Sequence, residues 1–375
     1  METKWWRRAL KPRSAQNATS GSPTPEQEME RANDLVRKGR FLEAIAMLTS
    51  SNRLQRDARI ERLLVDLRYR AFVETQWPTE RPAWPERVDD LFPGTLIPEI
   101  NAEDLTADRL RSAIANHGSL LVRGLVPIDR VDLLLDDIDR VFADFSGDSA
   151  TGPVSTEDPW FEPFPYEPQA TERKFRREAG GVLAVDSPRA MFDVIDTFEM
   201  AGIEKVASDY FGERPALLAK KWTLRRVPAD ARGSQWHQDG AFMGQNIRSL
   251  NVWLALSHCG DDAPGLDVVG RRLERIVETG TDGAFLHWTV GPGAVERAAE
   301  GTVVRPNFEP GDALLFDHMN LHCTAADAEM TRERYAIEAW LFAPSTYGAM
   351  TDMSDGRDDR LPADQIPLIY SCAPE

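Results

Sequence analysis

The sequence predicts an α+β protein in which helices precede a β core. In much of the first half of the chain, apolar residues recur three or four positions apart, which is typical of helices. From Ala216 onward the pattern changes to short apolar runs of strand length, separated by Gly, Pro and Asp turns. Few regular helices separate these runs, and this favours an antiparallel sandwich or barrel.

Composition narrows the possible partners and the compartment. The chain has 375 residues, with 44 Lys and Arg against 61 Asp and Glu, and a net charge of −17. So acidic a protein is a poor partner for nucleic acid or for an anionic membrane surface. No run approaches the ~20 apolar residues of a membrane span. Its 3 cysteines form no disulfide framework, so we expect a cytoplasmic protein.

The N-terminal quarter divides into an arm, a helical region and a linker. Residues 1–25 are basic and polar, without the apolar run of a secretion signal, and we expect a disordered arm. Residues 26–76 have helical spacing, and R-K-G-R-F-L-E-A-I-A-M-L resembles one tetratricopeptide unit. A solenoid needs about three such units. The region is therefore either a hairpin packed on the main domain or, through residues 26–72, a site for a protein partner. Prolines mark residues 77–104 as a linker.

The main domain is expected over residues 105–345, followed by a tail at 346–375. Thr106 can cap a helix that runs to His117, and Pro127 can open a second helix. Ser146–Gly181 is long and irregular, as lids and binding loops often are. Its basic group, Arg173–Arg177, is either a solvated face or a contact for an anionic substrate. The expected strands are Ser119–Gly124, Leu217–Val227, Ser249–Leu256, Gly311–Phe316 and Arg334–Phe342.

One short motif, W-H-Q-D-G, suggests a metal site. In an extended backbone His237 and Asp239 point to the same face, so both can bind one ion. First-row metals that keep open positions for chemistry often use two histidines and one carboxylate. His318 and His322 are the candidates for the second histidine. Beyond them Arg332 and Arg334 are candidates to anchor an anionic co-substrate.

Several segments in this order match a known family. They are H-G-S-L-L-V-R-G-L-V-P, W-T-L-R-R-V-P, W-H-Q-D-G, L-N-V-W-L-A-L, A-P-G-L-D-V-V, G-D-A-L-L-F, L-H-C-T and R-Y-A-I. Over Leu105–Ala343 the chain thereby resembles the phytanoyl-CoA dioxygenase-like family of Fe(II)/2-oxoglutarate oxygenases. The resemblance implies a double-stranded β-helix, also called a jelly-roll, that uses Fe(II), 2-oxoglutarate and O2. One departure is the turn after Gly265, which continues V-V-G-R-R where relatives often have P-G-S-H.

The resemblance assigns roles to individual residues. It places Fe(II) on His237, Asp239 and His322, in preference to His318. It places the distal carboxylate of 2-oxoglutarate on Arg334, in preference to Arg332, because Arg334 directly precedes Y-A-I as the family's arginine does. A guanidinium can hold a carboxylate through two hydrogen bonds, which a lysine could not reproduce. Thr324 would support that carboxylate. Trp253 would line the cofactor pocket or belong to the core.

The expected function is hydroxylation, or a related C–H oxidation, of a small-molecule metabolite with release of succinate and CO2. Asp239 favours this over halogenation, because relatives that place chloride on iron have a small residue at that position. The alternative is a metal-binding jelly-roll without oxygenase activity, or an interaction protein built on the helical hairpin.

Overall fold

The computed structural model describes residues 23–75, 77, 87–145, 159–164, 173, 176–231, 235–350 and 367–370. Most of the expected arm, residues 78–86 of the linker, much of the Ser146–Gly181 loop and most of the C-terminal tail lie outside these residues. The helices are α1 (Pro25–Arg37), α2 (Phe41–Leu54), α3 (Ala58–Glu74), α4 (Ala107–His117), α5 (Ile128–Asp144), α7 (Pro188–Met200), α8 (Ile203–Phe211), α9 (Gly240–Met243) and α10 (Pro292–Ala299). Short 3-10 turns include η1 (Ala102–Asp104), η3 (Ala184–Asp186), η4 (Ala219–Lys221) and η5 (Pro344–Met350).

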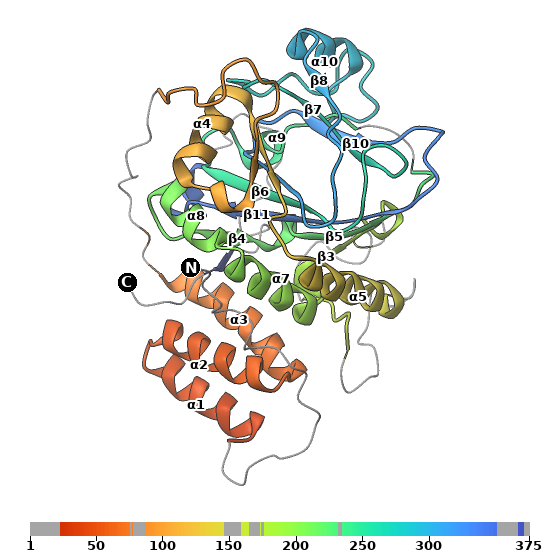
Figure 1. The fold of residues 1–375 in the computed structure, drawn as a ribbon. Coiled ribbons are helices and arrows are strands. Elements are labelled where there is room, and N and C mark those ends of the chain that lie inside the picture. Colours follow the sequence, from red (N-terminus) through yellow and green to blue (C-terminus); the bar gives the residue numbers. More distant parts are fainter. Residues whose placement is uncertain are drawn as a thin grey trace, which may run out of the picture.

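The strands form two sheets, one above the other in Figure 1. The strands are β1 (Glu99–Asn101), β2 (Ser119–Arg123), β3 (Gly181–Leu183), β4 (Ala216–Leu218), β5 (Thr223–Val227), β6 (Ser249–Ala255), β7 (Gly265–Val269), β8 (Val303–Val304), β9 (Ala313–Phe316), β10 (His322–Ala325), β11 (Arg334–Phe342) and β12 (Pro367–Ile369). The fold is the predicted α+β class, with a jelly-roll core, flanking helices and N-terminal helices. The larger sheet is mixed, and over the described residues the sheets do not close into a barrel.

Helix boundaries follow the capping signals in the sequence. The Thr106 side chain accepts a hydrogen bond from the Arg109 amide and opens α4, as predicted. The same helix ends at Gly118, whose φ of 88° is the left-handed conformation that favours glycine. Pro127 precedes α5 and fixes its start. These local signals account for the agreement between the predicted and observed helices.

The larger sheet is organised around β11. This strand pairs with β6 along one edge, while β5 and β4 share its other edge. The single strand predicted at Leu217–Val227 is therefore wrong: it is two strands separated by η4. The break is a tertiary effect, because Trp222 turns inward and donates a hydrogen bond of 3.0 Å to the Trp340 carbonyl. The apolar run in the sequence does not by itself indicate this break between β4 and β5.

The smaller sheet has the order β10-β7-β8 and carries His322, one of the predicted metal ligands. His237 lies outside any long strand, yet it forms an isolated antiparallel bridge with His322 at the start of β10. Its amide donates to the His322 carbonyl at 2.9 Å, and the reverse bond is 3.1 Å. Two segments far apart in the sequence are thus held side by side at fixed register.

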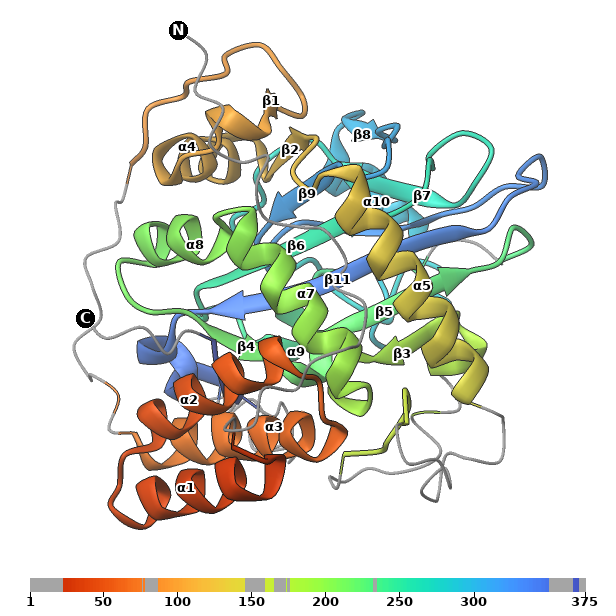
Figure 2. The same ribbon diagram turned by 60° about the horizontal axis from the view of Figure 1, so that its bottom comes forward.

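Helices cover the outer face of the larger sheet. Figure 2 shows α5, α7 and α8 lying across its strands, with α1–α3 beyond them. Ile45 and Leu48 of α2 are fully buried and belong to the same apolar core as the sheet. Arg53 adds an ion pair of 2.7 Å to Asp196 of α7. The N-terminal helices therefore pack onto the main domain.

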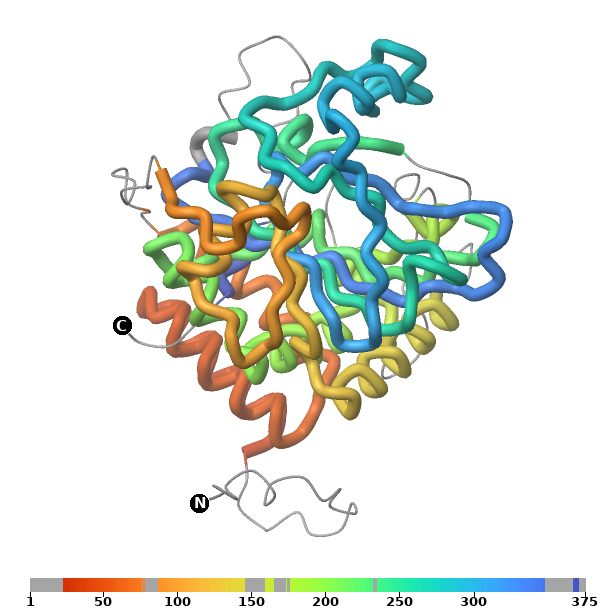
Figure 3. The backbone as a smooth tube through the Cα atoms, turned by 45° about the horizontal axis from the view of Figure 1, so that its top comes forward, coloured from red at the N-terminus to blue at the C-terminus, as the bar shows by residue number. Residues whose placement is uncertain are grey.

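The first and second halves of the chain interlock at the sheet. β2 pairs with β9, and Figure 3 shows the orange and blue segments that contain them side by side. Gly311 precedes β9 with a φ of 93°, and a Cβ there would lie 2.2 Å from the Val126 carbonyl oxygen. Only glycine fits this approach. In the part of the chain that the structure describes, no helix is long and apolar enough to cross a membrane.

Candidate metal centre and co-substrate pocket

Three predicted residues converge between the sheets. His237, Asp239 and His322 each offer a ligand atom, and these atoms all lie within 4.8 Å of one another. The imidazole rings of the two histidines are 4.5 Å apart between centroids. Asp239 Oδ2 lies 3.8 Å from His322 Nε2. Two imidazoles and one carboxylate in this arrangement are a donor set suited to Fe(II), with coordination positions left open.

Hydrogen bonds set the tautomer of both histidines. Nδ1 of His237 lies 2.8 Å from the Gln235 carbonyl, and Nδ1 of His322 lies 3.1 Å from the Asn320 carbonyl. A carbonyl can only accept, so each Nδ1 carries the proton and each Nε2 keeps its lone pair. Carbonyl partners of this kind orient metal-binding imidazoles. Both rings are therefore prepared to bind a cation through Nε2.

The charge state of the triad also suits a divalent metal. Burial lowers the pKa of His322 to about 4, with the nearby His237 contributing in the same direction. Burial alone would raise the pKa of Asp239, but Lys221, His237 and His322 outweigh it and lower that pKa. At neutral pH the site therefore holds a neutral His322 and an ionised carboxylate.

The shifted pKa of His322 predicts a pH dependence of folding without metal. In the unfolded chain this imidazole titrates near 6.5, and in the folded protein near 4. Between these values the unfolded state binds more protons, so the free energy of unfolding falls as the pH falls. We expect His322 to contribute a loss of about 2 kcal/mol between pH 7 and pH 5. Urea unfolding of the metal-free wild type and of metal-free His322→Asn, each at pH 7 and pH 5, measures this contribution of His322 to the free energy of unfolding. Equal pH dependence in both proteins would contradict the expectation.

His318, the rival candidate, is engaged elsewhere. Its Nδ1 lies 3.0 Å from the Ser249 hydroxyl and its Nε2 lies 3.1 Å from the Gln245 carbonyl. Because a carbonyl only accepts, Nε2 carries the proton, and Nδ1 accepts from Ser249. Both ring nitrogens are occupied, so His318 connects β6 to the preceding loop. The geometry favours His322 as the second imidazole of the site.

Arg334 is a buried cation prepared for an anion. Its side chain is 1% exposed, and Nη1 donates to the Gly265 carbonyl at 2.9 Å. Nε has no hydrogen-bond partner among the described residues, and neither has Nε1 of Trp253, whose ring lies 5.3 Å from the guanidinium. Burial lowers the pKa of Arg334 to about 10, so it stays charged at pH 7. Buried donors without acceptors fit a carboxylate such as that of 2-oxoglutarate.

The remaining candidates occupy different positions. Arg332 is exposed and pairs with Asp262 at 3.4 Å. Thr324 lies on the same face of β10 as His322, two residues further along, and is half-buried. Trp253 is buried on β6 and packs on Phe308 at 4.8 Å between ring centroids. Of these two, Trp253 lies beside Arg334, with its ring 5.3 Å from the guanidinium.

The sequence model of the family described as phytanoyl-CoA dioxygenase (PhyH) matches residues 114–328, more than half of the chain. The chain belongs to this family. The membership confirms the family predicted from the sequence, and it makes the chain an enzyme of the iron- and 2-oxoglutarate-dependent oxygenase type.

Several solved structures are similar to the chain. EvdO2 from Micromonospora carbonacea var. aurantiaca, complexed with 2-oxoglutarate, is 15% identical; the match covers 63% of this chain and 90% of that chain, with a TM-score of 0.42. The carbocyclase SnoK from nogalamycin biosynthesis is 12% identical over 65% and 86% of the two chains, with a TM-score of 0.43. EctD from S. alaskensis is 16% identical over 70% and 83%, with a TM-score of 0.42. A search of curated proteins found no match. It is the sequence match over residues 114–328 that places the chain in the family.

Sequence reasoning missed the groups around the triad in this phytanoyl-CoA dioxygenase family member. Lys221 Nζ lies 2.9 Å from Asp239 Oδ1 and 4.5 Å from the Phe242 ring centroid. Phe242 and Trp288 have ring centroids 5.5 Å apart, and Trp288 lies 5.9 Å from His237. The sequence signal for Lys221 was a pair of lysines that directly follows the apolar run A-L-L-A.

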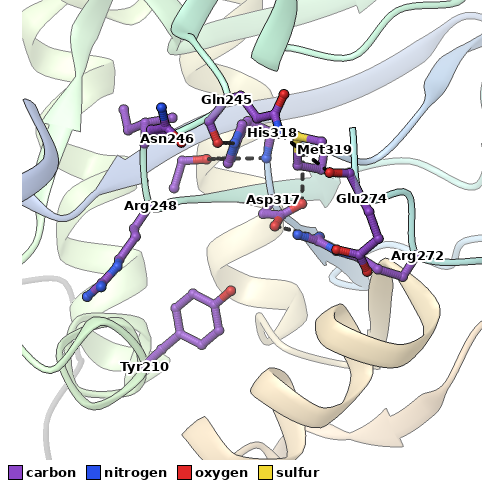
Figure 4. A pocket seen from close by; sticks show the side chains of 11 residues that line it. Tyr210, Gln245, Asn246, Arg248, Arg272, Glu274, Asp317, His318 and Met319 are labelled. Atoms are coloured by element: carbon purple, nitrogen blue, oxygen red, sulfur yellow. Dashed lines mark hydrogen bonds and ion pairs between the residues drawn. The ribbon is translucent and has the colours of Figure 1, made fainter. Parts of the chain in front are cut away.

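A polar cavity borders the triad of this family member. It has a volume of about 240 Å³ and is lined by Tyr210, Gln245–Ser249, Arg272, Glu274 and Asp317–Met319 (Figure 4). His318 forms part of its wall, and the His318 carbonyl accepts a hydrogen bond of 2.8 Å from Gly240, next to Asp239. Arg272 and Asp317 pair at 2.6 Å. The lining contains neither a triad residue nor Arg334.

Proposed function

We propose that this protein uses Fe(II), 2-oxoglutarate and O2 to oxidise a C–H bond of a small molecule, with release of succinate and CO2. His237, Asp239 and His322 would hold the iron, and Arg334 would hold the distal carboxylate of 2-oxoglutarate. The observation that carries the proposal is the pairing of a His-Asp-His cluster with a buried arginine that has no carboxylate partner in the described structure. Bound iron supplies an O2-binding centre that couples oxidation of 2-oxoglutarate to that of the substrate.

The protein's own groups prepare this reaction. The Gln235 and Asn320 carbonyls hold the Nδ1 protons of the two histidines, so Nε2 is the nitrogen that each neutral ring turns to a metal. The Gly265 carbonyl orients the guanidinium of Arg334, which limits the positions that a carboxylate can take. Phe242 and Trp288 are apolar surfaces beside His237 that help to exclude water from the site.

Retention of Asp239 supports oxidation over halogenation. The carboxylate is buried, and its Oδ2 lies 3.8 Å from His322 Nε2. It occupies the position at which a small residue would leave room for a halide. We therefore propose hydroxylation, or a related oxidation, of a small-molecule metabolite in the cytoplasm. Thr324 and Trp253 are proposed to line the 2-oxoglutarate pocket.

Anaerobic titration tests the proposal. Fe(II) and 2-oxoglutarate added together should give a weak visible charge-transfer band, and O2 with a substrate should then give succinate. The alternatives, a jelly-roll without oxygenase activity and a helical interaction protein, predict neither signal. Absence of both would rule out the oxygenase.

Two matched histidine variants identify the second imidazole. We expect His322→Ala to lose the band, because it removes a ligand, and His318→Ala to retain it, because that ring bonds only to protein groups. His318→Ala should cost about 1–3 kcal/mol of stability, since it leaves Ser249 and Gln245 without their partner. Loss of the band in His318→Ala with retention in His322→Ala would reverse the assignment.

A further inference from the structure

Lys221 is a cation at the edge of the proposed iron site. It ends η4, the turn that interrupts the run between β4 and β5. Its side chain is 18% exposed and reaches Asp239 Oδ1 at 2.9 Å. The other oxygen of the carboxylate faces His322. Lys221 therefore contacts the side of Asp239 that is turned away from the second histidine, and it keeps some access to solvent.

The charges around the triad do not cancel. Arg225 is bound by Glu338 through two hydrogen bonds of 3.0 and 2.9 Å, so this pair is neutral. Lys221 and Asp239 balance each other, which leaves Arg334 as one positive charge. A divalent metal adds two positive charges and 2-oxoglutarate adds two negative ones. Counted over these described residues, the loaded site keeps one net positive charge.

An excess positive charge in a partly buried site favours an anion. Arg334 is assigned to 2-oxoglutarate and Arg225 is occupied by Glu338, so of these three described cations Lys221, which pairs with Asp239, is the one placed to meet a third molecule. Once Asp239 shares its charge with a metal, it compensates Lys221 less completely. The protein as a whole carries a charge of −17, so the positive interior is a local feature.

Aromatic groups lie beside this cation. The Phe242 ring lies 4.5 Å from Lys221 Nζ, and its neighbour Trp288 contacts the His237 ring edge-on. Both side chains are half-buried, so they offer an apolar surface next to Lys221 and the triad. A molecule with an apolar body and an acidic end would match both features.

Resting on the proposed function, we propose that Lys221 binds an anionic group of the substrate, which is a small organic acid with an apolar body. The carboxylate contacts the Lys221 ammonium, and the body lies along Phe242 and Trp288 near the iron. Lys221 is then the residue that determines substrate class, and neutral or cationic analogues bind weakly.

Matched acids and amides test the proposal without turnover. The protein is loaded with Zn(II) and saturating 2-oxoglutarate, which occupies Arg334. Phenylacetate and phenylacetamide, and indole-3-acetate and indole-3-acetamide, are then titrated by ligand-observed NMR. We expect each acid to bind at least about tenfold more tightly than its amide, because a charge-assisted hydrogen bond replaces a neutral one.

Three variants assign the preference to Lys221. Lys221→Met keeps the length of the side chain and should remove the preference for acids, while Lys221→Arg should retain most of it. Lys205→Met removes a lysine that is 79% exposed and pairs with Asp209, and it should change nothing. Zinc content and the affinity for 2-oxoglutarate are measured in each variant and should match wild type.

Clear outcomes would overturn the proposal. Equal binding of acids and amides to wild type, including no binding of either, would refute it, as would a preference that persists in Lys221→Met. Loss of zinc from Lys221→Met would show that the lysine positions Asp239 for metal binding and does not bind the anionic group of the substrate. The charge-transfer band of Fe(II) with 2-oxoglutarate tests the proposed function separately. If the band forms but the acids are not preferred, the proposed function stands and only the proposed substrate class is wrong.

Discussion

Replacing Arg334 with Met is expected to weaken the binding of 2-oxoglutarate about 100-fold while leaving metal binding intact. The guanidinium is buried, and its Nε has no partner in the described structure, so an incoming carboxylate is the group that satisfies it. Two charge-assisted hydrogen bonds contribute about 3 kcal/mol. Arg334→Lys should weaken the binding of 2-oxoglutarate about tenfold, because an ammonium keeps the charge but cannot form the bidentate hydrogen bonds of a guanidinium. Calorimetric titration of Mn(II)-loaded protein with 2-oxoglutarate measures both effects.

Arg332→Met is the matched control. Arg332 lies two residues away and pairs with Asp262 at the surface, so its replacement should leave the affinity for 2-oxoglutarate unchanged. Without ligand, Arg334→Met should be no less stable than wild type, because it removes a buried charge that lacks a carboxylate partner. Unchanged binding in Arg334→Met, or weakened binding in Arg332→Met, would show that the co-substrate lies elsewhere.

The largest loss of stability is expected from Asp186→Asn. Arg173 Nε and Nη2 lie 2.8 and 3.0 Å from the Asp186 carboxylate, and both side chains are buried. Burial raises the pKa of Asp186, and the Arg173 hydrogen bond opposes that rise. The carboxylate also accepts from the Phe164 amide at 2.7 Å. Removing its charge takes the Asp186 carboxylate from the ion pair with a buried guanidinium, which costs about 3–5 kcal/mol. Urea unfolding at pH 7 measures the loss.

A surface pair provides the control for Asp186→Asn. Glu333 and Arg226 form an ion pair of 2.9 Å whose members are 41% and 38% exposed. Glu333→Gln should change the free energy of unfolding by no more than about 1 kcal/mol. Replacing both buried partners, in Arg173→Met with Asp186→Leu, should recover much of the loss. A small effect of Asp186→Asn would mean that Arg173 reaches solvent when its partner is removed.

Features with a local cause were predictable from the sequence. The helix that begins after Thr106 is set by one capping side chain, and α5 is set by Pro127. The pair His237 and Asp239 was recognisable because alternate residues of an extended chain share a face. Distinguishing Arg334 from Arg332 relied on resemblance to a family and remains a prediction; in the structure Arg334 is buried and Arg332 is exposed.

Features that depend on distant partners were not predictable. The basic group that contains Arg173 was interpreted as a solvated face or a substrate contact, yet Arg173 is buried against Asp186. Its partner Asp186 lies 13 residues further along the chain, in η3 directly after β3, and no spacing pattern pairs the two. Lys221 gave no clear signal, because its neighbour Asp239 belongs to a different segment and only the folded chain brings them together. The spacing of residues in the sequence indicates local geometry only. The contacts of Arg173 and Lys221 are tertiary, so this spacing does not predict them.

The position of Arg68 has a consequence for how the chain matures during synthesis. This buried α3 residue donates to the carbonyls of Ile369 and Tyr370 at 2.7 and 2.5 Å, while β12 pairs with β4 at the edge of the larger sheet. A ribosome releases the N-terminal helices long before residue 370, so in the nascent chain this guanidinium lacks its acceptors. These two hydrogen bonds of α3 can therefore form only after Ile369 and Tyr370 have been synthesised, whereas the ion pair of Arg53 with Asp196 needs no residue beyond α7.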